Sequence, residues 1–265
     1  MALPLRDDER DRNVPWATIA LIAINVIVFL FVQPAGFQFE RAPEGTQGQY
    51  WTSAERDEFS YRWGTVACEV VSGRPLSADP AQCKGDEPRF PPEGKVVLLA
   101  LVTCMFLHGS IAHLAGNMLF LWVFGGKVED RLGRANFLLL YLIGGIVATL
   151  GFVAVNQTSP IPLIGASGAI AVAMGAYLVL LPRGRILTVI ATAAFQVVYV
   201  PAAVVLLLFF VTQFSTNEED VAWQAHAAGM LVGAAAALAL RQVPSIRRRA
   251  QRDAADAELR VGVEF

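Results

Sequence analysis

Cysteine and histidine are both scarce in this chain of 265 residues, which contains three of each. No two cysteines have metal-ligand spacing with a nearby histidine, so cysteine-based metal motifs are excluded. Charged residues make up only 17% of the chain, and the formal net charge is −2. This near balance of charge argues against a nucleic-acid partner. We expect neither nucleic acid nor a cofactor.

Apolar residues are abundant instead, at 55% of the chain, and the mean hydropathy is +0.48. Several apolar runs approach or exceed the length that crosses a hydrocarbon core, which predicts an all-α polytopic membrane protein. The first run follows Pro15 and is too long for the core of a signal peptide. The ten residues that open the chain mix acids with two arginines. We therefore expect a retained first helix.

The apolar runs predict six transmembrane helices in one bundle. Two stretches are longer than a single span. The stretch from Val96 to about His108 is predicted to form a loop or partial insertion, and Ile186–Val200 to lie along the interface. One long helix kinked at Pro201 is the alternative for the second stretch. The six helices are predicted at Val14–Val32, Ser110–Phe124, Ala135–Val155, Ile164–Leu181, Pro201–Phe214 and Val221–Leu240.

The remaining segments complete the predicted organisation. Residues 1–13 form a charged, disordered tail, residues 14–241 the membrane domain, and residues 242–265 a charged C-terminal tail. Within the membrane domain, residues 34–94 form a long polar loop without periodicity. Cys68 and Cys83 lie in this loop. They could form a disulfide on an oxidising side of the membrane, and two free thiols are equally compatible with the sequence.

The distribution of lysine and arginine predicts the orientation. The Gly125–Arg134 turn, the Pro182–Arg185 turn and the C-terminal tail are basic, whereas the loops Asn156–Pro162 and Ser215–Asp220 contain no lysine or arginine. The positive-inside rule then makes both termini cytoplasmic. Because no basic, acid-poor leader is evident, we expect the plasma membrane of a bacterium. In the first basic turn, Glu129 and Arg131 are expected to form a surface or interfacial ion pair.

Ser167 lies in the sequence Gly165-Ala-Ser-Gly168, which opens an apolar run. Flanking glycines allow a tight bend and a close approach of the backbone to a substrate. A helix N-terminus after Ser167 would supply free N–H groups and a positive dipole end for an oxyanion. Ser167 is therefore a candidate nucleophile, although small residues of this kind also serve for packing between membrane helices.

The three histidines, His108, His113 and His226, all fall at the outer ends of predicted spans, at the same level as Ser167. His113 and Asn117 are four residues apart, so they share a helix face. Polar groups at membrane depth are costly and usually functional. A functional site is one interpretation of the histidines, and hydrogen bonds between helices are the plainer interpretation of each one. A Zn or Fe site is a third interpretation, although HxxxxH is not a regular spacing for metal ligands on a helix.

Small residues predict how two of the helices meet. Gly229 and Gly233 lie three and seven residues beyond His226, on its face of the sixth helix. Ala171 and Gly175 form a matching stripe beyond Ser167 on the fourth helix. Such stripes let helices approach closely, which would bring Ser167 and His226 within hydrogen-bond range.

Four motifs, in this order, resemble those of the rhomboid intramembrane serine proteases. The resemblance covers about Val96 to Leu240 and leaves out both tails and most of the loop 34–94. The long loop with its two cysteines, and Ala227-Ala228 before Gly229, depart from the family pattern. The motifs are His108-Gly-Ser-Ile-Ala-His113-Leu-Ala-Gly-Asn117-Met, Gly126-Lys-Val-Glu129-Asp-Arg131-Leu-Gly, Gly165-Ala-Ser167-Gly and Ala225-His226-Ala-Ala-Gly229.

The resemblance implies a six-helix bundle around a cavity open to the outer face. Ser167 would be the nucleophile and His226 the general base, without an acidic third member. His113 and Asn117 would line the oxyanion hole with the Ser167 N–H, and His108 would lie beside it. The substrates would be single-span membrane proteins in the lipid bilayer, and no cofactor would be used. The oligomeric state is left open. An inactive rhomboid-like protein that binds membrane clients, and a small transporter or metal-binding channel, are the competing hypotheses.

Overall fold

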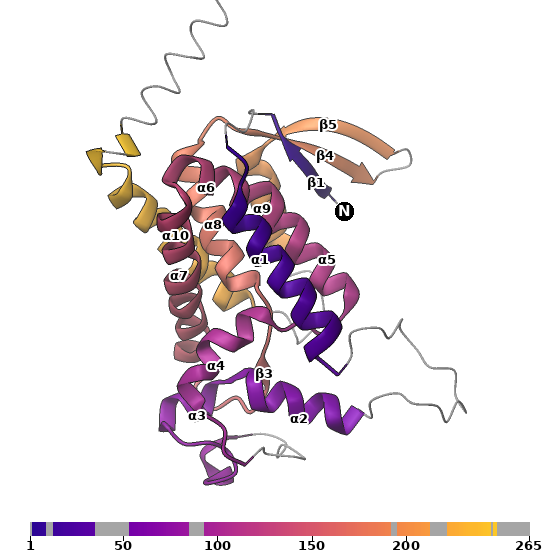
Figure 1. Cartoon of the computed structure of the whole chain (residues 1–265), viewed down its shortest axis with the longest axis vertical. Helices are drawn as coiled ribbons and strands as arrows, with labels where there is room; N and C mark the ends of the chain where they lie inside the picture. The colour runs from indigo at the N-terminus through magenta and orange to yellow at the C-terminus, as the bar shows by residue number, and fades with distance from the viewer. Residues whose placement is uncertain are drawn as a thin grey trace, which may run out of the picture.

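The computed structural model describes residues 2–8, 13–34, 53–84, 93–191, 195–212, 222–244 and 246–247, and helices dominate it (Figure 1). Within the described residues, six helical segments run side by side. They are α1 (Trp16–Ile27) with its π-helical extension η1 (Val28–Val32), α5 (Ile111–Phe120) continued by η4 (Leu121–Gly125) and α6 (Gly126–Leu132), α7 (Arg134–Val155), α8 (Ser167–Leu180), α9 (Ala202–Thr212) and α10 (Trp223–Leu240).

Three of these helices are long and apolar enough to cross a membrane, judged by length and composition among the described residues. They are Ile111–Leu132, Arg134–Val155 and Trp223–Leu240. Trp16–Val32, Val97–Phe106, Ser167–Leu180 and Ala202–Thr212 are shorter apolar helices. Large apolar side chains on the outside of the bundle, such as Leu139, Ile143 and Leu231, are exposed. A lipid bilayer would cover such a surface.

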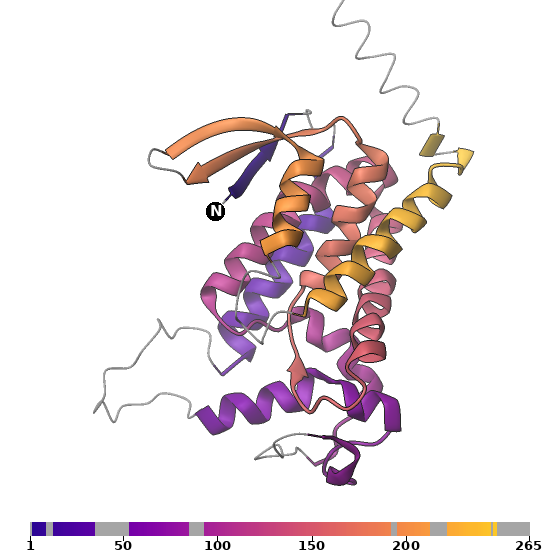
Figure 2. The same ribbon diagram turned by 180° about the vertical axis from the view of Figure 1, so that it is seen from behind.

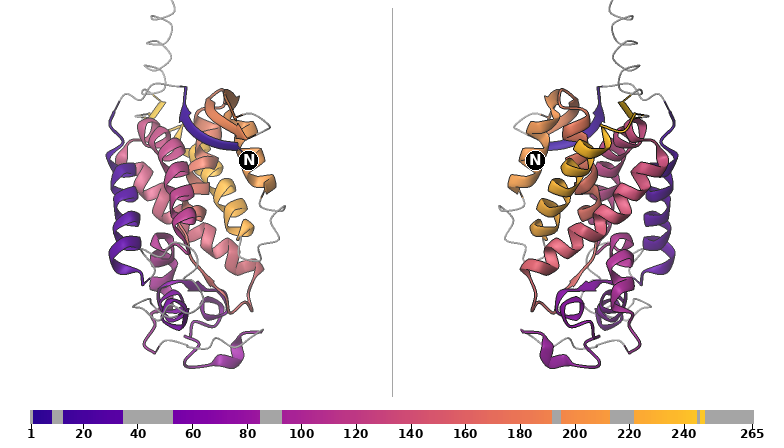
Figure 3. Two further views of the ribbon diagram at one scale, coloured as in Figure 1. Left: turned by 90° about the vertical axis from the view of Figure 1, so that its right-hand side faces the viewer. Right: turned by 90° about the vertical axis from the view of Figure 1, so that its left-hand side faces the viewer.

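The two ends of the bundle carry different structures (Figures 1 and 3). At one end lie the short elements α2 (Ser53–Trp63), β2 (Thr65–Val66), α3 (Ala67–Ser72), η2 (Pro80–Gln82), α4 (Val97–Thr103) and η3 (Cys104–Phe106), and β3 (Pro162–Leu163) pairs with β2. At the other end lies an antiparallel sheet in the order β1–β4–β5, formed by Ala2–Asp7, Arg185–Ala191 and Phe195–Pro201.

Four of the predicted helices correspond to observed ones within a few residues. Val14–Val32 corresponds to α1 with η1, Ala135–Val155 to α7, Ile164–Leu181 to α8, and Val221–Leu240 to α10. The fifth helix begins at Ala202, directly after Pro201, as expected from the preference of proline for a helix start. Phe214 and the loop Ser215–Asp220 lie outside the described residues.

The described residues of Ile186–Val200 are not helical. They form the strands β4 and β5, in which Ile186 pairs with Val200 and Val189 with Val197. The many β-branched residues among them favour strands. The kinked-helix alternative is therefore wrong.

The described part of residues 1–13 is ordered, which corrects the prediction of a disordered tail. Strand β1 pairs with β4, and Leu3 lies opposite Val189. Asp7 is buried, forms a hydrogen bond with Tyr177 of α8, and has Lys127 at 3.9 Å. The charged sequence suggested a segment exposed to solvent. Instead, residues 2–7 form a strand because their backbone pairs with β4, which begins at Arg185.

The Gly125–Arg134 segment is not a turn, because the second helix continues as far as Leu132 and ends at Gly133. Gly133 has φ +84°, a conformation that glycine adopts readily. Within the segment Val128 and Leu132 are completely or almost completely buried. Likewise, the loop 34–94 includes helices α2 and α3, and Val96–His108 contains helix α4, where a loop or partial insertion was predicted.

Candidate active site

Ser167 is the first residue of α8 and follows a sharply bent backbone. Gly165 has φ +131°, which an L side chain rarely adopts, and its N–H donates to the carbonyl oxygen of Cys104 at 2.9 Å. Ala166 is the N-cap residue and has no side-chain capping bond. The free N–H groups at the start of α8 therefore face the region around Ser167. Ser167 itself is only partly buried.

His226 lies in the first turn of α10 and reaches Ser167 directly. The imidazole Nε2 is 2.7 Å from the Ser167 Oγ, a hydrogen-bond distance. His226 is buried with 6% of its surface exposed, and the ring of Phe209 from α9 lies beside it at a centroid distance of 5.8 Å. When Nε2 carries no proton, the Ser167 hydroxyl donates to it, which is the arrangement required for removal of the serine proton.

The predicted glycine stripes bring α8 and α10 together (Figure 2). A Cβ atom on Gly229 would lie 2.5 Å from the carbonyl oxygen of Gly168 and 3.0 Å from the Ala171 Cβ. A Cβ on Gly233 would overlap the Val172 backbone, and one on Gly175 would overlap the Met230 backbone. The two helices approach closely along these glycines, and Ser167 and His226 lie within hydrogen-bond distance of each other.

His113 lies close to Gly165, two residues before Ser167. The Ser110 side chain caps α5 by accepting from the His113 N–H at 3.1 Å. A Cβ on Gly165 would lie 3.0 Å from the His113 Nε2 and 3.6 Å from the Ser167 Oγ. The His113 imidazole and the Ser167 hydroxyl therefore both border the position that a side chain on residue 165 would occupy.

His108 and Asn117 flank His113. The His108 ring meets the His113 ring edge to face, with centroids 5.1 Å apart, and His108 is buried. Asn117 lies one turn beyond His113 on α5 and is also buried. Within the described part of the chain, both ring nitrogens of His108 and the Asn117 Nδ2 have no hydrogen-bond partner.

Two supporting contacts were not predicted from the sequence. Gln33 follows η1, and its amide forms a pair of hydrogen bonds with the backbone of His108 at 2.9 and 3.0 Å. A polar residue directly after an apolar run is a signal that could have drawn attention to it. The carbonyl oxygen of Cys104 holds Gly165, and a backbone group leaves no signal in the sequence.

Glu129 is buried and has the Arg134 Nε at 3.9 Å, whereas its predicted ion-pair partner was Arg131. Its carboxylate is 3% exposed and accepts hydrogen bonds from the Ala17 N–H at 3.0 Å and the Thr18 N–H at 2.8 Å. These are unpaired donors at the N-terminus of α1, where a negative charge is favourable. The side chain of Glu129, from α6, thus caps the N-terminus of α1. No group of three or more His, Cys, Asp or Glu able to hold a metal ion occurs among the described residues.

Sequence comparisons relate this chain to known proteins. The Rhomboid domain model matches residues 96–243, more than half of the chain. The chain is 35% identical over 153 residues to rhomboid protease GluP of Bacillus subtilis, covering 56% of this chain and 28% of GluP. It is 35% identical over 97 residues to presenilin-associated rhomboid-like protein A, mitochondrial, of Danio rerio, covering 36% of this chain and 25% of that protein. Presenilin-associated rhomboid-like protein, mitochondrial, of Homo sapiens is 33% identical over 99 residues, covering 36% of this chain and 26% of that protein.

The matched regions span only about a quarter of the length of these relatives. The Rhomboid domain match at residues 96–243 includes Ser167, His226 and the helices that hold them. The family match, the helical membrane architecture and the order of the motifs are consistent with one another. This chain belongs to the rhomboid family.

Proposed function

We propose that this protein is an intramembrane serine endopeptidase that hydrolyses peptide bonds in or near the transmembrane segments of membrane proteins. Ser167 is the nucleophile and His226 the general base. The observation that carries the proposal is the 2.7 Å separation between the Ser167 Oγ and the His226 Nε2 in a family that includes a protein named as a protease.

In the first half of the reaction, the Ser167 Oγ attacks the carbonyl carbon of the scissile bond while its proton passes to the His226 Nε2. The carbonyl oxygen becomes an oxyanion. The Ser167 N–H, the His113 imidazole and the Asn117 amide stabilise that charge, aided by the positive end of α8. The unpartnered Nδ2 of Asn117 supports this role, because a donor without a partner is ready to bind an oxyanion.

In the second half, His226 returns its proton to the leaving amine, and an acyl group remains on Ser167. A water molecule then attacks this ester while His226 accepts the water's proton. The bond between the acyl carbon and the Ser167 Oγ breaks, His226 returns its proton to the Oγ, and the carboxylic acid is released. No acidic residue is needed to hold the imidazole in this scheme. Packing of Phe209 and the glycine contacts of α10 restrict the His226 ring in its place.

For the membrane, we propose that α1, α8 and α9 join the three long helices as spans, giving six. The end of the bundle that carries α2 and α3 would face away from the cytoplasm, in the plasma membrane of a cell. Two observations support this orientation. The opposite end carries Lys127, Arg134, Arg183 and Arg241, and Cys68 and Cys83 form a disulfide at the α2–α3 end, as bonds of this kind do in oxidising compartments.

The proposal is tested by reconstituting the full chain into liposomes with a single-span reporter protein. We expect cleavage in or near the reporter's transmembrane segment by the wild type, in the presence of EDTA as in its absence, and none by Ser167→Ala or His226→Ala. Binding of the reporter without cleavage by the folded wild type would instead support the client-binding alternative. Cleavage by Ser167→Ala would contradict the proposed nucleophile.

A further inference from the structure

We infer that the Cys68–Cys83 disulfide is a redox-sensitive positioning element, which holds the segment leading into Ser167 so that hydrolysis is fast only while the bond is oxidised. The inference rests on the proposed protease function. It concerns the contacts between the cap formed by residues 64–84 and the segment 158–165.

The disulfide joins two parts of the cap to each other. Cys68 lies in α3, Cys83 follows η2, and the two are 15 residues apart in the sequence. Val66, Cys68 and Leu76 are almost completely buried in a small apolar cluster with Tyr61 and Cys83 packed against it. A cluster of this size buries little apolar surface, so the covalent bond contributes a large share of its stability.

The cap binds the segment before the nucleophile at both ends of the disulfide. The N–H of Cys68 donates to the carbonyl oxygen of Ser159 at 3.4 Å. The N–H of Lys84, directly after Cys83, donates to the carbonyl oxygen of Thr158 at 2.9 Å. The two residues that accept these bonds are adjacent, so the disulfide fixes the distance between two donors that hold one short piece of backbone.

The attachment continues toward Ser167. In the β2–β3 pair, Thr65 lies opposite Leu163 and Val66 opposite Pro162. A Cβ on Gly64 would lie 2.9 Å from the Ile164 Cγ2, so the cap backbone packs directly on that side chain. Gly165 comes next, with His113 over it, and Ser167 follows two residues later. A shift of this segment therefore moves the backbone that presents both the nucleophile and its N–H.

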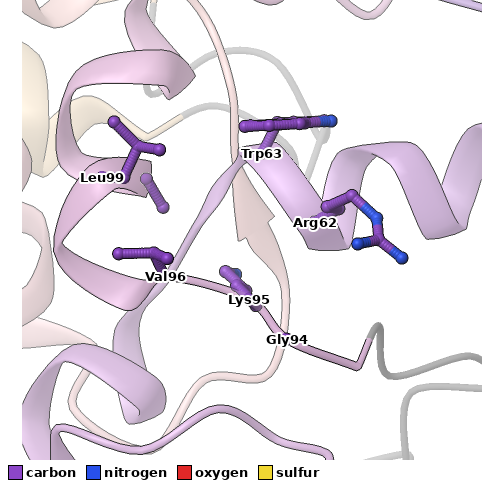
Figure 4. A pocket seen from close by; sticks show the side chains of 7 residues that line it. Arg62, Trp63, Gly94, Lys95, Val96 and Leu99 are labelled. Atoms are coloured by element: carbon purple, nitrogen blue, oxygen red, sulfur yellow. The ribbon is translucent and has the colours of Figure 1, made fainter.

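A separate anchor would keep α3 in place after reduction. Glu69 forms a buried ion pair with Lys95 and accepts from the Leu76 N–H at 2.9 Å. The Lys95 ammonium also donates to the carbonyl oxygen of Gly64 at 2.9 Å, beside the pocket that Arg62, Trp63 and Leu99 line (Figure 4). Reduction would thus release the Cys83–Lys84 side first, and the bundle would remain folded.

The chemical step is thiol–disulfide exchange. A dithiol such as dithiothreitol supplies two electrons and two protons. Its thiolate attacks one sulfur atom of the bond, and its second thiol displaces the mixed disulfide. The products are free thiols at Cys68 and Cys83 and the cyclic disulfide of the reagent. Oxidised glutathione reverses the reaction and restores the bond.

The test uses the full chain in detergent and measures how fast a fluorophosphonate labels Ser167, together with kcat and KM for the reporter. Misplacing reacting groups by about 1 Å costs up to ~100-fold in rate, so we expect reduction to slow labelling and to lower kcat by at least about fivefold. The final extent of labelling should stay near one per chain, because the bundle is still folded. Reoxidation should restore the rate.

The double variant Cys68→Ser/Cys83→Ser is the matched control, since it keeps Cys104 and lacks only the bond. It should label slowly with and without the reductant. The inference is overturned if the reduced wild type, with two newly alkylated thiols per chain, labels as fast as the oxidised protein. It is also overturned if the extent of labelling falls while the rate constant is unchanged, because that result indicates unfolding. If the double variant does not fold, reduction and reoxidation of the wild type decide the question.

Failure of this inference and failure of the proposed function give different results. Oxidised wild type that labels at Ser167 but ignores the reductant refutes only the positioning role of the disulfide. Folded, oxidised wild type that does not label at all refutes the proposed function, and the inference with it.

Discussion

Gly229 of α10 lies so close to Gly168 of α8 that a Cβ atom on Gly229 would be 2.5 Å from the Gly168 carbonyl oxygen. The neighbouring atom belongs to the backbone, so it cannot move aside as a flexible side chain would. Gly168 directly follows Ser167, and Gly229 lies one turn after His226. The contact between these two glycines therefore fixes the spacing of the proposed catalytic pair.

Gly229→Ala should force α10 away from α8 and lengthen the bond between the Ser167 Oγ and the His226 Nε2. Overpacking of this kind typically costs about 1–3 kcal/mol in stability. The larger effect should be on kcat, by about tenfold or more, because the geometry of the reacting groups changes. Reporter cleavage and the thermal unfolding midpoint, measured on the same preparation, check both expectations.

Gly116→Ala provides the matched control for this substitution. A Cβ on Gly116, within α5, would meet no atom within 4 Å apart from its chain neighbours and the nearby backbone of its own helix. Alanine is also the better helix former by up to about 1 kcal/mol. The Gly116 variant should be as stable as the wild type or more so, with unchanged cleavage. Equal losses of activity in the two variants would show that the spacing of α8 and α10 is not what matters.

The candidate site could be predicted from the sequence because membrane helices contain few polar residues. A serine between glycines and three histidines at one level stand out in so apolar a chain, and the stripe from Gly229 to Gly233 indicates which helices meet. The pairing of Ser167 with His226 follows from these local patterns. Helix geometry converts such spacings into faces without any knowledge of the tertiary structure.

The missed features depend on contacts between distant residues. Strand β1 is held by pairing with β4 and by the burial of Asp7, neither of which residues 1–13 reveal on their own. Glu129 looked like a surface charge because its partners, the free N–H groups of Ala17 and Thr18, belong to another helix. The sequence left the state of Cys68 and Cys83 open, and the fold joins them.

Asn117→Ala should remove one donor of the proposed oxyanion hole. Loss of such a donor costs about 3–4 kcal/mol in activation free energy, or ~100- to 1000-fold in kcat. KM should change much less, because the interaction forms mainly in the transition state. Steady-state cleavage of the reporter separates the two constants. A large rise in KM with kcat preserved would show that Asn117 binds substrate and not the oxyanion.

Lys95→Met should destabilise the cap more than removal of both members of its ion pair. The single substitution leaves the Glu69 carboxylate, which is 1% exposed, without its cation. Breaking a buried pair in this way costs about 3–5 kcal/mol, whereas replacing both groups is often nearly neutral. The thermal unfolding midpoints of Lys95→Met and Lys95→Met/Glu69→Gln, measured against the wild type, compare the stability lost in the single and the double variant. If the double variant is no more stable than the single one, the pair does not act as a unit.

Lys95 should also make stability depend on pH. Burial lowers the pKa of Lys95 below its ordinary value, with Glu69 opposing that shift. Between the folded pKa and the unfolded value of about 10.4, the unfolded chain binds more protons, so this contribution to stability rises with pH. The wild type should therefore gain stability relative to Lys95→Met/Glu69→Gln as pH increases toward about 10. If the stability of the two proteins changes with pH in the same way, the titration of Lys95 does not contribute to the pH dependence.

The most direct test of the central claim is fluorophosphonate labelling of the purified, oxidised full chain, since this reagent reacts with an activated serine. The wild type, Ser167→Ala and His226→Ala would be compared at equal folded concentration, with the labelled peptide identified by mass spectrometry. The account predicts label on Ser167 in the wild type and none in either variant. Label at full rate in His226→Ala, or no label in the folded wild type, would contradict the Ser167–His226 pair as the catalytic centre.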